Sequence, residues 1–157
     1  MNGKPITKVS VTYNVAVITL DKFPNNLKLI SDIFNSIAQQ NINVDMISQS
    51  PPHKGNITLS FTIPSDDLVK AITILNNCKK LHPGIQVEVD ASNVKVSVYG
   101  ESMANIPGVA ANLFTMLANN NIEINLVTTS EVDISYLISD RDVDKAVSLI
   151  KKEYNLE

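Results

Sequence analysis

ISDIFNSIAQQNINVDMI at residues 30–47 returns eighty positions later as AANLFTMLANNNIEINLV at residues 110–127. The two stretches share their apolar positions, and Phe34 aligns with Phe114. Each stretch places apolar residues first at helical spacing and then at alternating spacing. Self-similarity at a fixed interval indicates a structural unit that occurs twice in the chain.

A second pair of stretches extends the repeat. ITLSFTIPSDDLVKA at 57–71 aligns with VDISYLISDRDVDKA at 132–146, now at an offset of 75 positions. The five-residue difference falls within 50–56, where Pro51, Pro52 and Gly55 indicate a turn. The two copies therefore differ in one turn, which is longer in the first copy.

Both copies predict the same order of elements, which is strand, helix, strand, strand, helix. The ranges are 16–20, 30–38, 42–46, 57–63 and 68–75 in the first copy, and 94–98, 110–118, 122–126, 132–138 and 143–150 in the second. The two strands in the middle follow each other closely, so each copy is expected to contain a hairpin.

One further strand is predicted after the first copy and one before it. The run at 85–89 alternates and completes a ferredoxin-like βαββαβ unit, whereas the second copy lacks such a run. The surplus alternating run at 6–13 is expected to cross over and supply this missing strand, because an open sheet edge would otherwise remain. We predict an α+β fold of two such units in tandem, 14–92 and 93–157 plus 5–13, each an antiparallel sheet with helices on one face.

Carboxylates stand at the start of the second helix of each copy. Ser65 and Ser139 precede aspartates and are predicted to be N-caps. Asp66 and Asp67 also resemble a pair of carboxylates for acid–base catalysis. Capping explains them more simply, and we expect no catalytic site.

Composition excludes several classes of protein. The 157 residues are 44% hydrophobic and 18% charged, and no apolar run approaches the roughly 18 residues of a membrane span. The start, MNGKPITK, lacks the apolar middle of a signal peptide, so a cytoplasmic protein without membrane contact is expected. With 13 basic against 16 acidic residues and 5% aromatic residues, a nucleic-acid partner is not expected.

Motifs for cofactors, metals and nucleophilic catalysis are missing from the sequence. The five glycines are scattered singly, so no glycine-rich phosphate loop can be assembled. His53, His82 and Cys78 are too few for a transition-metal site, and neither histidine stands in a motif with a nucleophile. We expect no cofactor, no metal and no enzymatic activity of the chain on its own.

An ordered set of motifs resembles the paired ACT regulatory domains at the C-terminal end of aspartokinases. The motifs are NINVDMISQ at 41–49, SFTIPSDDL at 60–68, VKVSVYG at 94–100, PGVAANLF at 107–114 and TTSEVDISYLI at 128–138. The opening KPITKVSV at 4–11 is similar to the junction that follows the kinase domain in that family. The resemblance covers nearly the whole chain.

This resemblance implies a regulatory function. Aspartokinases phosphorylate aspartate in amino-acid biosynthesis, and their ACT pair senses end products for feedback inhibition. The implied effector is lysine or threonine, and the implied assembly is a homodimer through the ACT units. Because this sequence contains no kinase domain, it would act on a kinase domain or a separate catalytic subunit. The alternative is a free-standing tandem ACT sensor that regulates another enzyme.

An amino-acid effector needs donors for its carboxylate and acceptors for its ammonium group. In an ACT unit, both are expected where the first strand turns into the first helix, because amide groups at a helix N-terminus favour a carboxylate. This turn is 21–28 in the first copy and 100–108 in the second. In the second copy, Pro107 suits a helix start and Gly108 permits close approach of the backbone.

The resemblance assigns effector-binding residues by position. In the first unit these are Asn25, Lys28, Ile30 and Gln49, and facing them from the second unit of another chain are Asn121, Glu123 and Ile124. A second pocket would involve Ala110, Ser130 and Glu131. Where the family commonly reads Asp-Lys-Pro-Gly, this chain has Asn25-Asn26-Leu27-Lys28, and a shifted alignment would place Asp21 and Lys22 there instead.

Structural roles compete with these assignments. Asn41 and Asn121 both follow a predicted helix, and asparagine tolerates the left-handed conformation of a helix C-terminus. Gln49 stands at the end of a predicted strand, and Ser130 and Glu131 suit an exposed turn. We expect the effector to bridge two chains, since each turn supplies only part of the required donors and acceptors.

Overall fold

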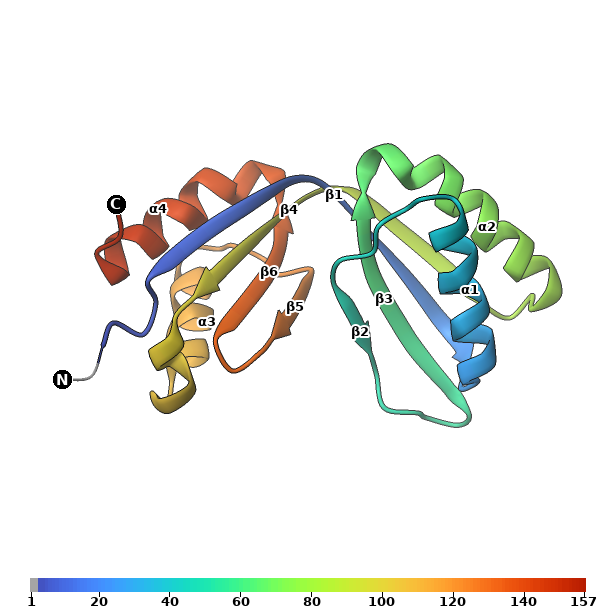
Figure 1. The fold of residues 1–157 in the computed structure, drawn as a ribbon, viewed down its shortest axis with the longest axis horizontal. Helices are drawn as coiled ribbons and strands as arrows, with labels where there is room; N and C mark the ends of the chain where they lie inside the picture. Colours follow the sequence, from blue (N-terminus) through green and yellow to red (C-terminus); the bar gives the residue numbers. More distant parts are fainter. Residues whose placement is uncertain (1–2) are drawn as a thin grey trace. The chain divides into compact units, whose positions relative to one another are not determined.

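A computed structural model describes residues 3–157. Its contacts divide the chain into two compact units. We name Asn14–Ser92 the first unit, and the described residues up to Tyr13 together with Asn93–Glu157 the second unit. Each unit is a sheet with two helices on one face; the first unit follows the order βαββαβ, and in the second the start of β1 takes the place of the last strand (Figure 1).

In the first unit, the sheet has the strand order β2-β3-β1-β4. Its elements are β1 from Asn14 onward, α1 (Leu27–Gln39), β2 (Ile47–Gln49), β3 (Asn56–Pro64), the 3₁₀ turn η1 (Ser65–Asp67), α2 (Leu68–Leu81) and the first part of β4. Antiparallel pairing joins β3 to both β1 and β2. Ile18, Phe61, Ile37 and Leu75 are buried between the sheet and the two helices.

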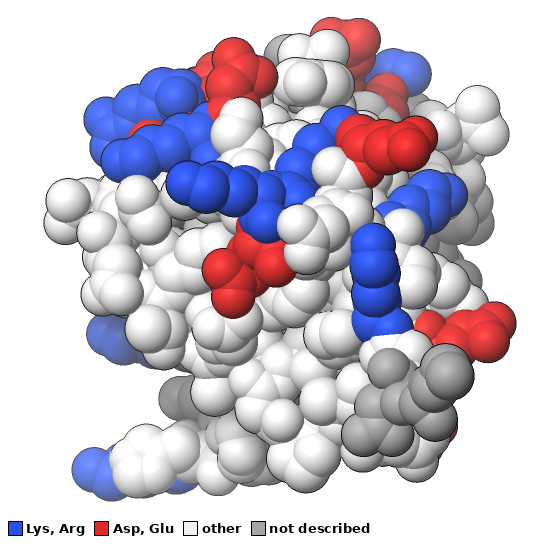
Figure 2. Space-filling model, turned by 90° about the vertical axis from the view of Figure 1, so that its left-hand side faces the viewer, with Lys and Arg blue, Asp and Glu red and all other residues white. Residues whose placement is uncertain are grey.

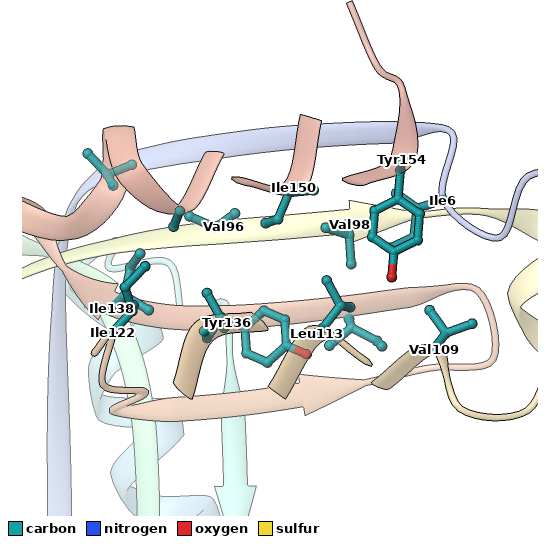
Figure 3. Packing of buried hydrophobic residues seen from close by; sticks show 14 of the residues in the cluster. Ile6, Val96, Val98, Val109, Leu113, Ile122, Tyr136, Ile138, Ile150 and Tyr154 are labelled. Carbon is teal, nitrogen blue, oxygen red and sulfur yellow. The ribbon is translucent and has the colours of Figure 1, made fainter. Parts of the chain in front are cut away.

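The sheet of the second unit has the order β1-β4-β6-β5. Its elements are the start of β1, the end of β4, the 3₁₀ turn η2 (Glu101–Asn105), α3 (Val109–Asn119), β5 (Leu126–Thr129), β6 (Asp133–Ser139), the 3₁₀ turn η3 (Asp140–Asp142) and α4 (Val143–Tyr154). Val96, Val98, Leu113 and Ile150 pack in its core (Figure 3).

Two long strands, β1 (Lys8–Pro24) and β4 (Gln86–Tyr99), contribute residues to both units. The start of β1 belongs to the second unit, where Ile6 is fully buried and the Thr7 amide donates to the Tyr99 carbonyl at 2.8 Å. The prediction that the N-terminal strand completes the C-terminal unit is therefore confirmed. Asn14, the first residue of the first unit, has a φ of 55°.

The predicted strands at 42–46 and 122–126 are wrong for most of their length, because regular pairing covers only Ile47–Gln49 and Leu126–Thr129. In the first unit, the Thr62 hydroxyl accepts from the Met46 amide at 2.9 Å, and the Thr62 carbonyl accepts from the Asp45 amide. The Thr62 amide in turn donates to the Met46 carbonyl at 3.0 Å, so Asp45 and Met46 both face Thr62 and the pairing is irregular, as in a β-bulge. The alternating apolar residues remain buried at Ile42 and Met46, which explains the misleading pattern.

The predicted cap at Ser65 is wrong, because Pro64 is the N-cap residue of η1, whereas Ser139 is the N-cap residue of η3 as predicted but makes no side-chain cap bond. A 3₁₀ turn precedes both helices, and neither serine caps it with its side chain. The Ser65 hydroxyl instead donates to the Ala91 carbonyl at 3.1 Å. Asp66 and Asp67 lie in η1, directly before α2, where their negative charges interact favourably with the positive end of the helix dipole.

Within residues 3–157, every helix is too short or too polar to span a membrane. The same described residues contain no cluster of three or more His, Cys, Asp or Glu side chains that could hold a metal ion.

Candidate functional site

The second unit turns from β4 into α3 through an open corner. The Gly100 amide donates to the Val132 carbonyl at 2.9 Å, which ties the end of β4 to the turn before β6. The chain then makes the 3₁₀ turn η2 and reaches Gly108, whose φ of 88° lies in the left-handed region that favours glycine. Helix α3 begins directly after this glycine.

The N-terminus of α3 has no side-chain cap. Its N-cap residue is Gly108, which has no side chain, and its first turn has no acidic residue. The first intrahelical bond runs from the Asn112 amide to the Gly108 carbonyl at 2.9 Å. Amide groups earlier in the turn have no partner within the helix, and they carry the positive end of the helix dipole.

A hollow of about 490 Å³ lies at this corner. Its lining combines the α3 N-terminus, the turn η2 and the β5–β6 turn, and includes Ala110, Ser130 and Glu131. The structure therefore brings together the three residues that the resemblance assigns to a second pocket. Their role toward a ligand stays a prediction.

Ser130 organises the side of the hollow opposite the helix. Its amide donates to the Asp133 carbonyl at 2.8 Å, and its hydroxyl oxygen accepts from the amides of Asp133 at 3.1 Å and Val132 at 3.3 Å. The hydroxyl proton remains available to an acceptor. The neighbouring Glu131 is exposed and adds a carboxylate to the lining. The lining thus holds helix amides as donors and the Glu131 carboxylate as an acceptor, and a free amino acid requires both kinds of group.

The equivalent corner of the first unit differs because a side chain caps its helix. Asn26 is the N-cap of α1, and its side-chain oxygen accepts from the Leu29 amide at 3.2 Å. The Asn25 amide donates to the Gly55 carbonyl at 2.9 Å. Lys28 lies in the first turn of α1 and pairs with Asp32 at 2.6 Å on the exposed helix surface.

The remaining predicted residues of the first unit are spread over separate places. Asp21 lies in β1, and its carboxylate accepts from the Thr58 hydroxyl at 2.9 Å. Hydrogen bonds from the Lys22 backbone amide and from Thr58 lower the pKa of Asp21. Ile30 packs against the core from α1, and Gln49 is exposed at the end of β2.

Asn121, Glu123 and Ile124 lie between α3 and β5, and none of them lines the hollow. Asn121 and Asn41 have φ values of 56° and 57°, and their amides donate to the carbonyls of Ala118 and Ala38. The predicted left-handed ends of both first helices are confirmed. Any contact of these residues with an effector is additional to that structural role.

Sequence reasoning missed Met103, Ile106 and Thr129, which also line the hollow. Pro107-Gly108 correctly marked the corner. No motif indicated that the preceding 3₁₀ turn would direct Met103 into the same hollow. Asn26 was likewise not identified as a cap, although an asparagine directly before a helical run is a recognised signal.

A second hollow, of about 540 Å³, lies beside the C-terminus of α4 and is lined by Lys4, Lys8 and Lys151. Lys and Arg side chains gather on this face of the chain with Asp and Glu side chains among them (Figure 2). Lys4 donates to the Asn155 carbonyl at 3.0 Å. These lysines complement the negative end of the α4 dipole.

Comparison with known proteins places the chain in a family. The ACT domain family model matches residues 24–78 and 96–154. The aspartokinase of Bacillus sp. (strain MGA3) is 38% identical over 139 residues, which are 88% of this chain but 34% of that protein. The chain therefore spans about a third of the length of such curated relatives.

Two solved structures match over nearly their full chains. One is of aspartokinase alpha and beta subunits, with 32% identity, a TM-score of 0.85, and 96% of this chain and 99% of that chain covered. The other is the regulatory subunit of aspartate kinase from Thermus thermophilus, with 28% identity, a TM-score of 0.83, and 95% and 98% covered. The chain belongs to the ACT domain family, and its two units correspond to the regulatory part of aspartokinases.

Proposed function

We propose that this chain is the amino-acid-sensing part of an aspartokinase and that lysine or threonine is its effector. The observation that carries this proposal is the uncapped N-terminus of α3, which faces Ser130 and Glu131 across a hollow of about 490 Å³. The amides suit the effector's carboxylate, and the Glu131 carboxylate suits its ammonium group.

The partner of this sensor is a kinase domain or a catalytic subunit that phosphorylates aspartate. Support comes from the relatives, of which this chain matches only the regulatory third. A matching solved chain is itself described as a regulatory subunit. The chain on its own carries out no phosphoryl transfer in this proposal.

Effector binding is transmitted to the kinase domain or catalytic subunit through a homodimer, because the effector stabilises one arrangement of the two chains. Helix α3, VAANLFTMLAN, has no charged residue, and Phe114 on its surface is 43% exposed. An uncharged helix surface meets its own copy without like-charge repulsion. In the dimer, the first unit of one chain presents Asn25, Lys28, Ile30 and Gln49 to Asn121, Glu123 and Ile124 of the other chain. A shifted alignment with the family would bring Asp21 to that place instead. If the effector's binding site is complete in only one arrangement of the two chains, effector binding raises the population of that arrangement.

Isothermal titration and thermal unfolding with lysine and with threonine test the proposal. At 100 times its dissociation constant, a ligand adds about 2.7 kcal/mol to the free energy of unfolding. Glu131→Gln should weaken binding about tenfold, because it removes the carboxylate opposite the helix. Glu88→Gln, an exposed position of β4 in the first unit, is the matched control and should bind as the parent chain does. The proposal is contradicted if neither lysine nor threonine binds to the chain.

The free-standing sensor remains the second candidate. Addition of the chain to an aspartokinase catalytic subunit, with and without effector, separates the two functions. Effector-dependent inhibition of aspartate phosphorylation supports the aspartokinase assignment. Amino-acid binding without complex formation favours a sensor for another enzyme.

A further inference from the structure

One stretch of β1 has a strand neighbour on one side only. Regular pairing of β1 with β3 starts at Val15, and the residues before Asn14 belong to the second unit, where β1 is the outer strand beside β4. Residues 8–13, which we name the β1 edge, therefore have β4 on one side and no described strand on the other (Figure 1). Backbone groups along such an edge are free to pair with an added strand.

The free backbone groups of the β1 edge follow from one hydrogen bond. The Thr7 amide donates to the Tyr99 carbonyl at 2.8 Å, so Thr7 points toward the end of β4. In an antiparallel pair, successive residues direct their backbone groups alternately toward the neighbouring strand and away from it. Lys8, Ser10 and Thr12 therefore direct their amides and carbonyls away from β4. All three residues are exposed.

A hollow of about 540 Å³ lies between the start of the β1 edge and the end of α4. Residues 7–9 line it from the strand, and Lys151 and Leu156 line it from the helix end. The hollow thus has an outer strand on one side and a helix end on the other. An extended chain that paired with the β1 edge would place its side chains in this hollow.

The lining of this hollow is basic. It contains three lysines and one acidic residue, Glu157. Lys4 donates to the Asn155 carbonyl at 3.0 Å, which offsets the negative end of the α4 dipole. Lys8 and Lys151 make no ion pair with any other described residue. Two ammonium groups are therefore left for the carboxylates of a ligand.

A second copy of this chain fits the hollow less well than a free segment does. One outer strand of the first unit is β4, whose start carries the exposed residues Glu88 and Asp90. A copy that offered this strand would bring α2 with it, because Val87 and Leu75 pack in the same core. Such pairing of unlike edges also adds further copies when the assembly does not close. A free extended segment needs no room for a helix.

We propose that the β1 edge binds an extended acidic segment of a partner polypeptide by strand addition. The backbone of the segment pairs with Lys8, Ser10 and Thr12, and its carboxylates pair with Lys8 and Lys151. In this mode of recognition, main-chain hydrogen bonds supply affinity and side chains supply specificity. The competing explanation is that lysines on an outer strand only prevent unwanted strand pairing.

Titration of the whole chain with a synthetic peptide of alternating glutamate and valine, followed by NMR-detected hydrogen exchange, tests the proposal. At saturation, amide exchange of Lys8, Ser10 and Thr12 should slow at least about tenfold, because these amides gain a partner. Val9 and Val11 already point toward β4 and should change little. A peptide of alternating lysine and valine is the matched control and should leave all five amides unchanged.

Variants of the chain and of the peptide separate strand addition from charge attraction alone. Lys8→Gln combined with Lys151→Gln should weaken binding of the acidic peptide several-fold, since both free ammonium groups are lost. Lys79→Gln combined with Lys80→Gln, at the exposed end of α2, is the matched control and should bind as the parent chain does. Methylation of the peptide's backbone nitrogens keeps its charge but removes its amide donors, so it should abolish binding.

Three results would overturn the proposal. Unchanged exchange of Lys8, Ser10 and Thr12 with the acidic peptide would leave the lysines the role of protecting the edge. Equal binding of the methylated peptide would show attraction between charges without strand addition. Self-association of the chain without peptide, measured by sedimentation and lost in Lys8→Gln combined with Lys151→Gln, would assign the edge to a second copy. Binding of amino acids is not involved in any of these measurements.

Discussion

In the first unit, the corner between β1 and α1 is closed by Asn26, which caps the helix with its own side chain. In the second unit, the same corner is left open by Gly108, which has no side chain to offer. Both corners connect the same elements of the same repeated fold. The difference shows that a repeat can preserve its core while only one copy caps its first helix with a side chain.

The two units also differ in the aromatic pair that packs beneath α1 in the first unit and beneath α3 in the second. Phe34 and Phe61 of the first unit pack edge to face at 5.2 Å, and Phe114 and Tyr136 of the second unit do so at 5.7 Å. Tyr136 adds a hydroxyl that is buried without a hydrogen-bond partner among the described residues. Burial raises the pKa of Tyr136. The second unit thus has a buried hydroxyl on Tyr136 where the equivalent Phe61 of the first unit has only a ring hydrogen.

Gly100→Ala should have the largest effect on stability. A Cβ atom at this position would lie 1.9 Å from the Pro5 carbonyl oxygen, so the N-terminal segment would have to leave its place. We expect a loss of about 3 kcal/mol in chemical denaturation. Gly84→Ala in the first unit meets no atom within 4 Å and should change stability by less than about 0.5 kcal/mol. Equal effects of the two changes would show that the close approach at Gly100 is unimportant.

Phe61→Tyr comes next in magnitude. It places in the first unit the unpaired hydroxyl that Tyr136 has in the second, and leaving a buried donor unsatisfied costs about 2 kcal/mol. Tyr136→Phe is the reverse change and should leave stability equal or raise it by up to about 1 kcal/mol. Urea unfolding of both variants measures this. A marked loss in Tyr136→Phe would reveal a partner, such as a bound water, for that hydroxyl.

Asn26→Ala should destabilise the chain by about 1 kcal/mol, because the α1 cap is lost. Asn26→Gly should cost only a few tenths of a kcal/mol and convert the first corner to the uncapped state of the second. Asn35→Ala, on the exposed surface of the same helix, is the control and should be close to neutral. Thermal unfolding provides the comparison, and an equal loss at Asn35 would count against the capping role.

The smallest expected effect is on stability at acidic pH and depends on Asp21. A lowered pKa in the folded state means that ionised Asp21 contributes stability above its unfolded-state pKa, and this is lost as the pH falls through the folded-state pKa. Thr58→Val removes one of its donors, so the pKa of Asp21 should rise and the first unit should unfold at a slightly higher pH, below about pH 4. Thr73→Val on the surface of α2 is the control. Carboxyl NMR titration of Asp21 decides the outcome directly.

The sequence predicted most of the fold because the repeat shows each element twice. It also predicted the crossover of the N-terminal strand, since one copy had a strand too many and the other a strand too few. The irregular segment at 42–46 escaped prediction because Asp45 and Met46 both bond to the single distant residue Thr62, through its backbone and its hydroxyl, and this interrupts regular pairing. Met103 was missed for a similar reason, because its place depends on how a 3₁₀ turn folds onto the core.

The path of β1 has a consequence for synthesis on the ribosome. Ile6, Val9 and Val11 leave the ribosome about 80 residues before Asn93 and the rest of the unit that buries them. At roughly 5 to 20 residues per second, this delay lasts several seconds. The residues of the first unit form an uninterrupted stretch and can pack during that interval. The nascent chain therefore carries an apolar strand whose partners in the second unit are translated only after the whole of the first unit.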